Sequence, residues 1–120
     1  EPQMAALEIL MTDVMARWSI PAQGVIGHSD MAPGRKIDPG ARFDWPRLEC
    51  QGLARKGSHD GGAQNPTFEL YRKMARRLGF TSSVDDETLL SAVRLRYRPW
   101  VNGPLTSEDF IPLRPSASEM

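Results

Sequence analysis

The sequence is poor in the features that assign a protein to a class at a glance. It has a single cysteine, Cys50, so no disulfide can form within the chain. Lysine plus arginine and aspartate plus glutamate number 15 each, so no net charge attracts nucleic acid or an anionic membrane. No apolar run approaches the ~20 residues that span a bilayer. What remains is the composition of an ordinary globular protein, with 40% apolar and 25% charged residues.

The length and the first residues bound the domain organisation. The chain has 120 residues, enough for one ordinary domain or two small ones. It begins Glu1-Pro2-Gln3 and runs directly into an amphipathic helical pattern, without an initiator methionine or a signal peptide. Such a start fits a processed N-terminus, and it fits equally a segment cut from a longer protein.

The first part of the chain predicts a helix followed by a short strand. Residues 4–18 carry an apolar stripe at helical spacing, and Pro21 should end the helix near Ser19. The stripe consists of Leu7, Leu10, Met11, Val14 and Trp18. Val25-Ile26 is a β-branched pair that predicts a buried strand leading to His28. A packed turn or short helix should follow around residues 43–48.

The second part of the chain predicts helices only. A polar, glycine-rich stretch follows Arg55 and is typical of a linker. Asn65 is a candidate N-cap for a helix that Gly79 ends, and Ser83 is a candidate N-cap for a helix that Pro99 ends. Thr106 is a candidate cap of a short last helix.

One loop concentrates groups that bind metals or move protons. In "GHSDMAPGRKIDPG", residues 27–40, His28 and Asp38 are ten positions apart, and two Pro-Gly pairs favour a loop that doubles back. An imidazole nitrogen and a carboxylate oxygen are typical zinc ligands. The spacing alone leaves open a structural histidine without a metal, with Asp30 and Arg35 as loop-fixing residues or solvated charges.

Lys36 adds a second kind of chemistry to the loop. It precedes Asp38 by two positions, so both side chains point the same way if the segment is extended. A lysine beside a metal-bound water stabilises the negative charge that develops on an attacked carbonyl oxygen.

The amino-acid sequence of the loop closely resembles a known family signature. The blocks G-H-S-D and G-R-K-x-D-P-G resemble those of the zinc-dependent, bacterial N-acetylmuramoyl-L-alanine amidases of type 2, a family related to the peptidoglycan recognition proteins. The resemblance continues upstream through "QMAALEILMTDVMARWSIPAQGVIGHSD" and downstream through "ARFDWPRL", so it covers roughly residues 3–48.

The resemblance implies roles for particular residues. His28 and Asp38 would be Zn²⁺ ligands, and Lys36 would be the catalytic residue that stabilises the tetrahedral intermediate. Three further residues would fix the loop or support the ligands: Ser29, Asp30 and Arg35. The implied reaction is hydrolysis, by a zinc-bound water, of the amide between N-acetylmuramic acid and the first L-alanine of the stem peptide. The residues that bind this substrate are not implied.

The chain departs from the family pattern upstream. The pattern has a further histidine ligand and a proton-handling glutamate before the helix with which this chain begins. His59, in the polar linker, does not match that histidine. We therefore expect the chain to be the C-terminal portion of a longer amidase, with the missing N-terminal part of the same protein as its partner. Alone, it should bind zinc weakly and hydrolyse nothing, because two protein ligands do not complete a zinc site.

The implied fold class is α/β. Residues 1–55 would be the C-terminal part of a mixed-sheet catalytic domain, and residues 56–66 a linker. Residues 67–114 resemble, more loosely, the small helical peptidoglycan-binding domains appended to some of these amidases, and residues 115–120 would be a tail. A helical extension that merely packs on the catalytic domain is the alternative.

Rival functions follow from the same features. A non-catalytic peptidoglycan-recognition module is the main one, although it would have no reason to keep His28, Asp38 and Lys36 together. A split protein whose halves assemble on demand is another. Nucleic acid is disfavoured as a partner, because the helical part lacks a dense basic stripe with interleaved aromatics. A peptidoglycan-binding tail favours the bacterial envelope or periplasm, whereas an enzyme that recycles small muropeptides would be cytoplasmic.

Overall fold

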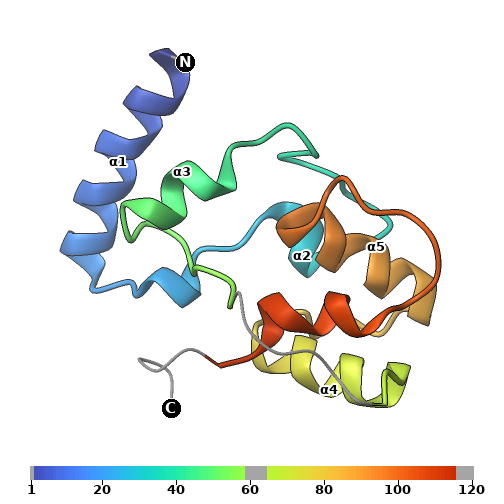
Figure 1. Cartoon of the computed structure of the whole chain (residues 1–120). Coiled ribbons are helices and arrows are strands. Elements are labelled where there is room, and N and C mark those ends of the chain that lie inside the picture. The colour runs from blue at the N-terminus through green and yellow to red at the C-terminus, as the bar shows by residue number, and fades with distance from the viewer. Residues whose placement is uncertain (1, 59–64, 116–120) are drawn as a thin grey trace. The chain divides into compact units, whose positions relative to one another are not determined.

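The computed structural model describes residues 2–58 and 65–115, and every regular element in them is a helix (Figure 1). The α-helices are α1 (Pro2–Trp18), α2 (His28–Met31), α3 (Trp45–Cys50), α4 (Phe68–Arg77) and α5 (Asp86–Tyr97). The 3-10 helices are η1 (Ala22–Gly24) and η2 (Ser107–Leu113).

The predicted mixed sheet is wrong for the described residues, which contain no strand. The prediction depended on Val25-Ile26, and Val25 is indeed extended, with φ −97° and ψ 112°. An extended residue becomes part of a sheet only when a second strand accepts and donates the ladder hydrogen bonds. No second strand occurs in these ranges, and Ile26 is 41% exposed rather than buried. The backbone preference is therefore local, without a sheet around it.

Helix α1 ends where the sequence indicates. Ser19 has a left-handed φ of 53°, and the N–H of Ile20 donates to the carbonyl of Met15 at 2.9 Å. This is the hydrogen bond of a Schellman stop, which satisfies a carbonyl that the helix leaves open. Pro21 then prevents the helix from resuming.

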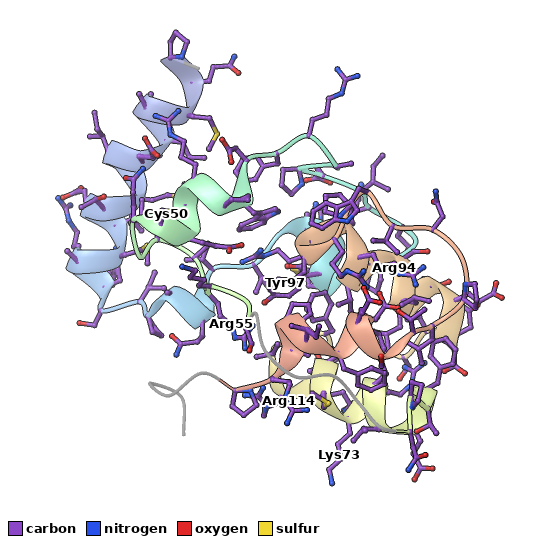
Figure 2. All side chains as sticks on the ribbon, viewed as in Figure 1. Cys50, Arg55, Lys73, Arg94, Tyr97 and Arg114 are labelled. Atoms are coloured by element: carbon purple, nitrogen blue, oxygen red, sulfur yellow. The ribbon has the colours of Figure 1, made fainter. Side chains whose placement is uncertain are left out.

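The apolar stripe of α1 is largely exposed, and the buried residue is a glutamate. Leu10 and Trp18 are 59% and 72% exposed, whereas Glu8 is 9% exposed. Arg47 of α3 donates to Glu8 from Nε at 2.6 Å and from a terminal nitrogen at 2.8 Å, and Gln51 donates as well. The hydrogen bond from Arg47 holds the pKa of Glu8 below its ordinary value despite burial. This fork joins α1 to α3, while Cys50 at the end of α3 is exposed (Figure 2).

The chain forms two compact units that are each discontinuous in sequence. One consists of Glu1–Ile26 and Asp44–Lys56, and the other of Gly27–Phe43 and Gly57–Met120. The loop that carries the candidate site therefore belongs to the same unit as the helices that follow residue 65. The predicted domains, 1–55 and 67–114, remain a prediction for the whole protein; the predicted tail, 115–120, lies outside the described residues except for its first residue.

The second unit has the larger apolar core, built by α4, α5 and η2. Thr67 caps α4 by accepting from the N–H of Leu70 at 3.3 Å, and Asp85 takes the N-cap position of α5. Both observed caps thus lie two residues after the predicted caps Asn65 and Ser83. The buried core residues are Tyr71, Ala75, Phe80, Leu89, Leu90, Ala92, Val93, Phe110 and Leu113.

A buried ion pair ties η2 to α5. The Asp109 carboxylate is 1% exposed and accepts from Arg94 at 2.9 and 2.7 Å, from Arg98 at 2.7 Å and from the Thr106 N–H at 2.9 Å. Arg94, which projects from α5 in Figure 2, also donates to the carbonyls of residues 103 and 104. Burial alone would raise the pKa of Asp109, but the hydrogen bonds and the two positive charges outweigh it and lower that pKa.

Replacing Asp109 with asparagine removes the negative charge between two guanidinium groups and leaves Arg94 buried without a counter-ion. We expect the free energy of unfolding at pH 7 to fall by about 3 kcal/mol, measured by urea denaturation. Glu108→Gln is the matched control, since Glu108 is 71% exposed and 3.7 Å from Arg98. It should cost less than about 1 kcal/mol. Equal losses in the two variants would contradict the assignment.

The same carboxylate gives the fold a pH dependence. Its folded pKa lies below the ordinary value of ~3.9, so in acid the unfolded chain binds more protons than the folded one. The stabilisation is complete above about pH 5 and is lost as the pH falls through the folded pKa. Asp109→Asn should flatten the stability curve in this acid range, and parallel curves for the two proteins would show that Asp109 does not titrate there.

Candidate functional site

The loop of residues 27–40 starts with the single-turn helix α2, which is capped at its N-terminus by a side chain from within the turn. The N–H of Gly27 donates to Oδ2 of Asp30 at 2.9 Å, and Asp30 lies three positions into the turn. The N–H of Ser29 donates to the carbonyl of Asp38 at 3.0 Å. This second hydrogen bond brings the end of the loop back to the start of α2. Because of it, residues ten positions apart become neighbours.

The two predicted metal ligands lie together. Nδ1 of His28 and Oδ2 of Asp38 are 3.2 Å apart. A charge-assisted N–H···O bond is usually ~2.7–2.9 Å long. Two ligands on one tetrahedral zinc, each at ~2.0–2.1 Å from the metal, are ~3.3 Å from each other. The separation lies at the long end of the range for an N–H···O hydrogen bond and equally fits two donors to one zinc ion.

The pair is open to further ligands. The side chains of His28 and Asp38 are 45% and 64% exposed, so a metal held by them would remain accessible from solvent. Residues 2–58 and 65–115 contain no group of three or more histidine, cysteine, aspartate or glutamate side chains able to hold a metal. The described residues thus bring the two predicted ligands together without a third. His59 lies outside them.

Asp30 is buried and caps the start of α2. It is 2% exposed, Oδ2 accepts from Gly27, and Oδ1 has no hydrogen-bond partner. Burial raises the pKa of Asp30 to about 6, while the Gly27 N–H and the positive charge of Arg96 act in the opposite direction. Arg35 is exposed and enters the loop's hydrogen bonding through its backbone N–H, which donates to the carbonyl of Ala32 at 3.2 Å.

Lys36 and Ser29 border a cavity of about 360 Å³ between the loop and α5. Lys36 is exposed, whereas Ser29 is 3% exposed. Helix α5 and its N-cap contribute residues that the sequence did not single out as site residues: Asp85, Glu87, Thr88, Ser91, Ala92 and Leu95. The contact joins segments far apart in the sequence, and no local pattern in the sequence signals it.

The loop rests on α5 at one close contact. Gly34 has a φ of +81°, and a Cβ added to it would lie 2.9 Å from Cγ2 of Thr88. Real Cβ atoms do not come that close to another carbon, so only glycine fits this position. In Figure 1, α2 lies beside α5 accordingly.

The arginines of the helical part are used inside the unit. Arg72 pairs with Asp86 at 3.0 Å, and Arg77 donates to the carbonyl of Leu113 at 2.6 Å. Arg94 and Arg98 donate to the Asp109 carboxylate. These charges stabilise tertiary contacts within the described residues.

Comparisons with known proteins point to one family. Residues 1–41 match the family model described as N-acetylmuramoyl-L-alanine amidase, and this range contains the whole candidate loop through Gly40. N-acetylmuramoyl-L-alanine amidase AmiD of Escherichia coli K12 is 45% identical over 51 residues, which are 42% of this chain and 18% of that protein. The 1,6-anhydro-N-acetylmuramyl-L-alanine amidase AmpD of Enterobacter cloacae is 40% identical over 50 residues, 42% of this chain and 27% of that protein.

A solved structure has the same fold. It is the complex of the E. coli N-acetylmuramyl-L-alanine amidase AmiD with the substrate anhydro-N-acetylmuramic acid-L-Ala-D-gamma-Glu-L-Lys. The TM-score is 0.76 at 24% identity, over 92% of this chain and 49% of that one. The chain therefore spans about half of this structure and less than a third of the curated relatives it matches.

The similarity to the solved chain extends beyond the matched loop. Because 92% of this chain is covered, the helices after residue 65 take part in the shared fold. Among the described residues, no helix is long and apolar enough to cross a membrane.

Gly34→Ala tests the contact between loop and helix. It adds a Cβ both at a left-handed φ and against Thr88, so we expect a loss of stability larger than the ~1 kcal/mol typical of the backbone change alone. Gly103→Ala is the matched control, because Gly103 has a φ of +91° and nothing within 4 Å of its added Cβ. Urea denaturation measures both.

The excess cost should disappear when the facing methyl group is removed. In a Thr88→Ser background, Gly34→Ala should cost no more than Gly103→Ala does. If the two glycine variants are equally stable with Thr88 in place, the loop does not depend on this contact.

Proposed function

We propose that this chain is part of a peptidoglycan hydrolase that cleaves the amide between N-acetylmuramic acid and the L-alanine of the stem peptide. The observation that carries the proposal is the 3.2 Å approach of His28 Nδ1 to Asp38 Oδ2 within the segment that matches the amidase family model. Lys36 in the same loop supplies the third group that the reaction uses.

His28 and Asp38 are the residues that would hold zinc. When bound, zinc polarises a carbonyl group and makes water a nucleophile at neutral pH. The described residues lack a third ligand, so the remaining ligands come from another part of the protein. Ser29 and Asp30 hold the pair in position, Ser29 through its backbone bond to Asp38 and Asp30 through its bond to Gly27.

Lys36 would act on the substrate directly. Its ammonium donates to the carbonyl oxygen of the scissile amide, where negative charge develops as the tetrahedral intermediate forms. The side chain forms no ion pair within the part of the chain that the structure describes, so its charge is available for this role. The leaving group is the amino group of the L-alanine.

The substrate is peptidoglycan or a muropeptide released from it. The solved structure of AmiD holds an anhydromuramyl peptide, and the AmpD relative from Enterobacter cloacae is named for the 1,6-anhydro sugar. We place the protein in the bacterial envelope, because a helical segment that binds peptidoglycan would be of use there. A recognition module without catalysis is the alternative, and it has no need for His28, Asp38 and Lys36 in one loop.

Zinc content and amide hydrolysis of the whole protein test the proposal. His28→Ala should lose zinc and activity together. Lys36→Ala should keep its zinc and lose at least ~100-fold in kcat, the usual cost of removing one oxyanion donor. Lys73→Ala is the matched control, because Lys73 is an exposed lysine of α4 outside the loop (Figure 2).

Two results would overturn the proposal. If the wild-type protein holds no zinc and binds muropeptides without cleaving them, the recognition module replaces the enzyme. If Lys36→Ala is as active as Lys73→Ala, Lys36 has no part in the reaction.

A further inference from the structure

We propose that Arg96 of α5 is a positioning residue for the candidate site. Together with Asp30 it forms a buried pair of opposite charges, which holds α2 in the orientation that brings His28 to Asp38. The use of this orientation in catalysis rests on the proposed function. Arg96 itself would contact neither the metal nor the substrate, and it acts through Asp30.

The Asp30 carboxylate is buried with only part of its hydrogen bonding satisfied. Asp30 is 2% exposed, Oδ2 accepts from the Gly27 N–H at 2.9 Å, and Oδ1 has no hydrogen-bond partner in the described residues. An ionised carboxylate is stable in a protein interior only beside a positive charge or with several hydrogen bonds. One backbone N–H does not suffice, so Asp30 needs a cation close by.

One face of α5 packs against the loop and carries a buried cation. Thr88, Ala92 and Arg96 follow one another at i, i+4 and i+8, so they share this face. Thr88 is the close neighbour of Gly34, and Ala92 borders the same cavity as Ser29. Arg96 is 5% exposed and continues the face by one turn. The cation that the buried carboxylate needs is thus on the side of α5 that faces the loop.

The charge of Arg96 acts on Asp30. Burial raises the pKa of Asp30 to about 6, and the positive charge of Arg96 opposes this increase. The guanidinium carbon lies 4.3 Å from the centroid of the Tyr97 ring, a cation–π contact that helps to fix its position. Arg94, two positions earlier, projects from another side of the helix and binds Asp109. The two buried arginines of α5 therefore stabilise different neighbours, η2 and α2.

The orientation of α2 decides whether His28 reaches Asp38. Helix α2 has four residues, far fewer than the ~12–15 that a helix needs to be stable by itself. Tertiary contacts must therefore set its position. Asp30 is in the same turn as His28, and the N–H that it accepts belongs to Gly27, directly before His28. Anchoring Asp30 on Arg96 thus fixes the backbone from which the imidazole projects.

Arg96→Met tests the proposal, because it keeps a long apolar side chain and removes the charge. The first measurement is the NMR signals of the His28 imidazole in the metal-free 120-residue chain at pH 7. A His59→Gln background leaves His28 as the only histidine. We expect the signals to move toward those of Asp38→Ala, in which the partner of the ring is missing. Arg96→Lys keeps a positive charge and should leave the signals near their wild-type positions.

The zinc affinity of the whole protein is the second measurement. Arg96→Met should lower it about tenfold or more, the usual cost of losing a residue that supports a metal ligand, and Arg96→Lys should retain most of it. Arg72→Met is the matched control, because it removes another partly buried arginine of the same unit, which pairs with Asp86 at 3.0 Å. It should lower stability in urea without changing either measurement.

A double variant shows whether Arg96 acts through Asp30. Asp30→Asn keeps an acceptor for the Gly27 N–H and removes the negative charge. Once Asp30 is asparagine, Arg96→Met should have little further effect on the His28 signals or on zinc affinity. The double variant leaves no charge buried alone, so it provides a folded protein if Arg96→Met by itself does not fold. Its His28 signals should then match those of Asp30→Asn.

Two results would overturn the proposal. One is a folded Arg96→Met protein with wild-type His28 signals and wild-type zinc affinity. The other is additive effects of Arg96→Met and Asp30→Asn, which would mean that the two residues act separately. Failure of the proposed function is a distinct result: if the whole protein holds no zinc, the His28 signals of the metal-free chain still decide whether Arg96 positions the ring.

Discussion

The candidate site depends on how closely the loop approaches α5. Hydrogen bonds within the loop of residues 27–40 and its contact with α5 hold the loop in place. No strand or disulfide supports it in the described residues. Gly34 makes the contact, because any other residue would collide with Thr88. The Ser29 N–H bond to Asp38 then closes the loop and brings His28 to its partner. The arrangement of the loop is therefore tied to α5, which lies far along the chain, and we expect loss of that helix to separate His28 from Asp38.

The sequence predicts where the helices begin and end better than it predicts which elements pack against them. The end of α1 follows from Pro21, and the cap of η2 at Thr106 follows from a local hydroxyl and the carboxylate three residues on. Caps and breakers act within a few residues, so a single sequence contains them. The strand at Val25-Ile26 failed because a strand needs a partner, and β-branched residues indicate an extended backbone without saying whether a partner exists. The apolar stripe of α1 likewise predicts the helix, but its spacing does not indicate whether these side chains are buried, and they are largely exposed.

The candidate residues were predicted from the resemblance, and their proximity from the turns. His28 and Asp38 meet because two Pro-Gly pairs reverse the chain between them, which the spacing indicates. The α5 side of the cavity was not predicted, because it arises only when α5 packs beside the loop. The arginine pair around the buried Asp109 was also missed. In the sequence its arginines resemble solvated helix charges, and only the fold brings the carboxylate between them.

The central claim is that His28 and Asp38 share one zinc ion. Anomalous diffraction at the zinc edge, from crystals of the whole protein, tests it most directly. We predict one strong peak ~2.0–2.1 Å from both His28 Nδ1 and Asp38 Oδ2, with further protein ligands completing the shell. A zinc ion bound elsewhere, with His28 and Asp38 joined by a direct hydrogen bond and no metal between them, would contradict the claim.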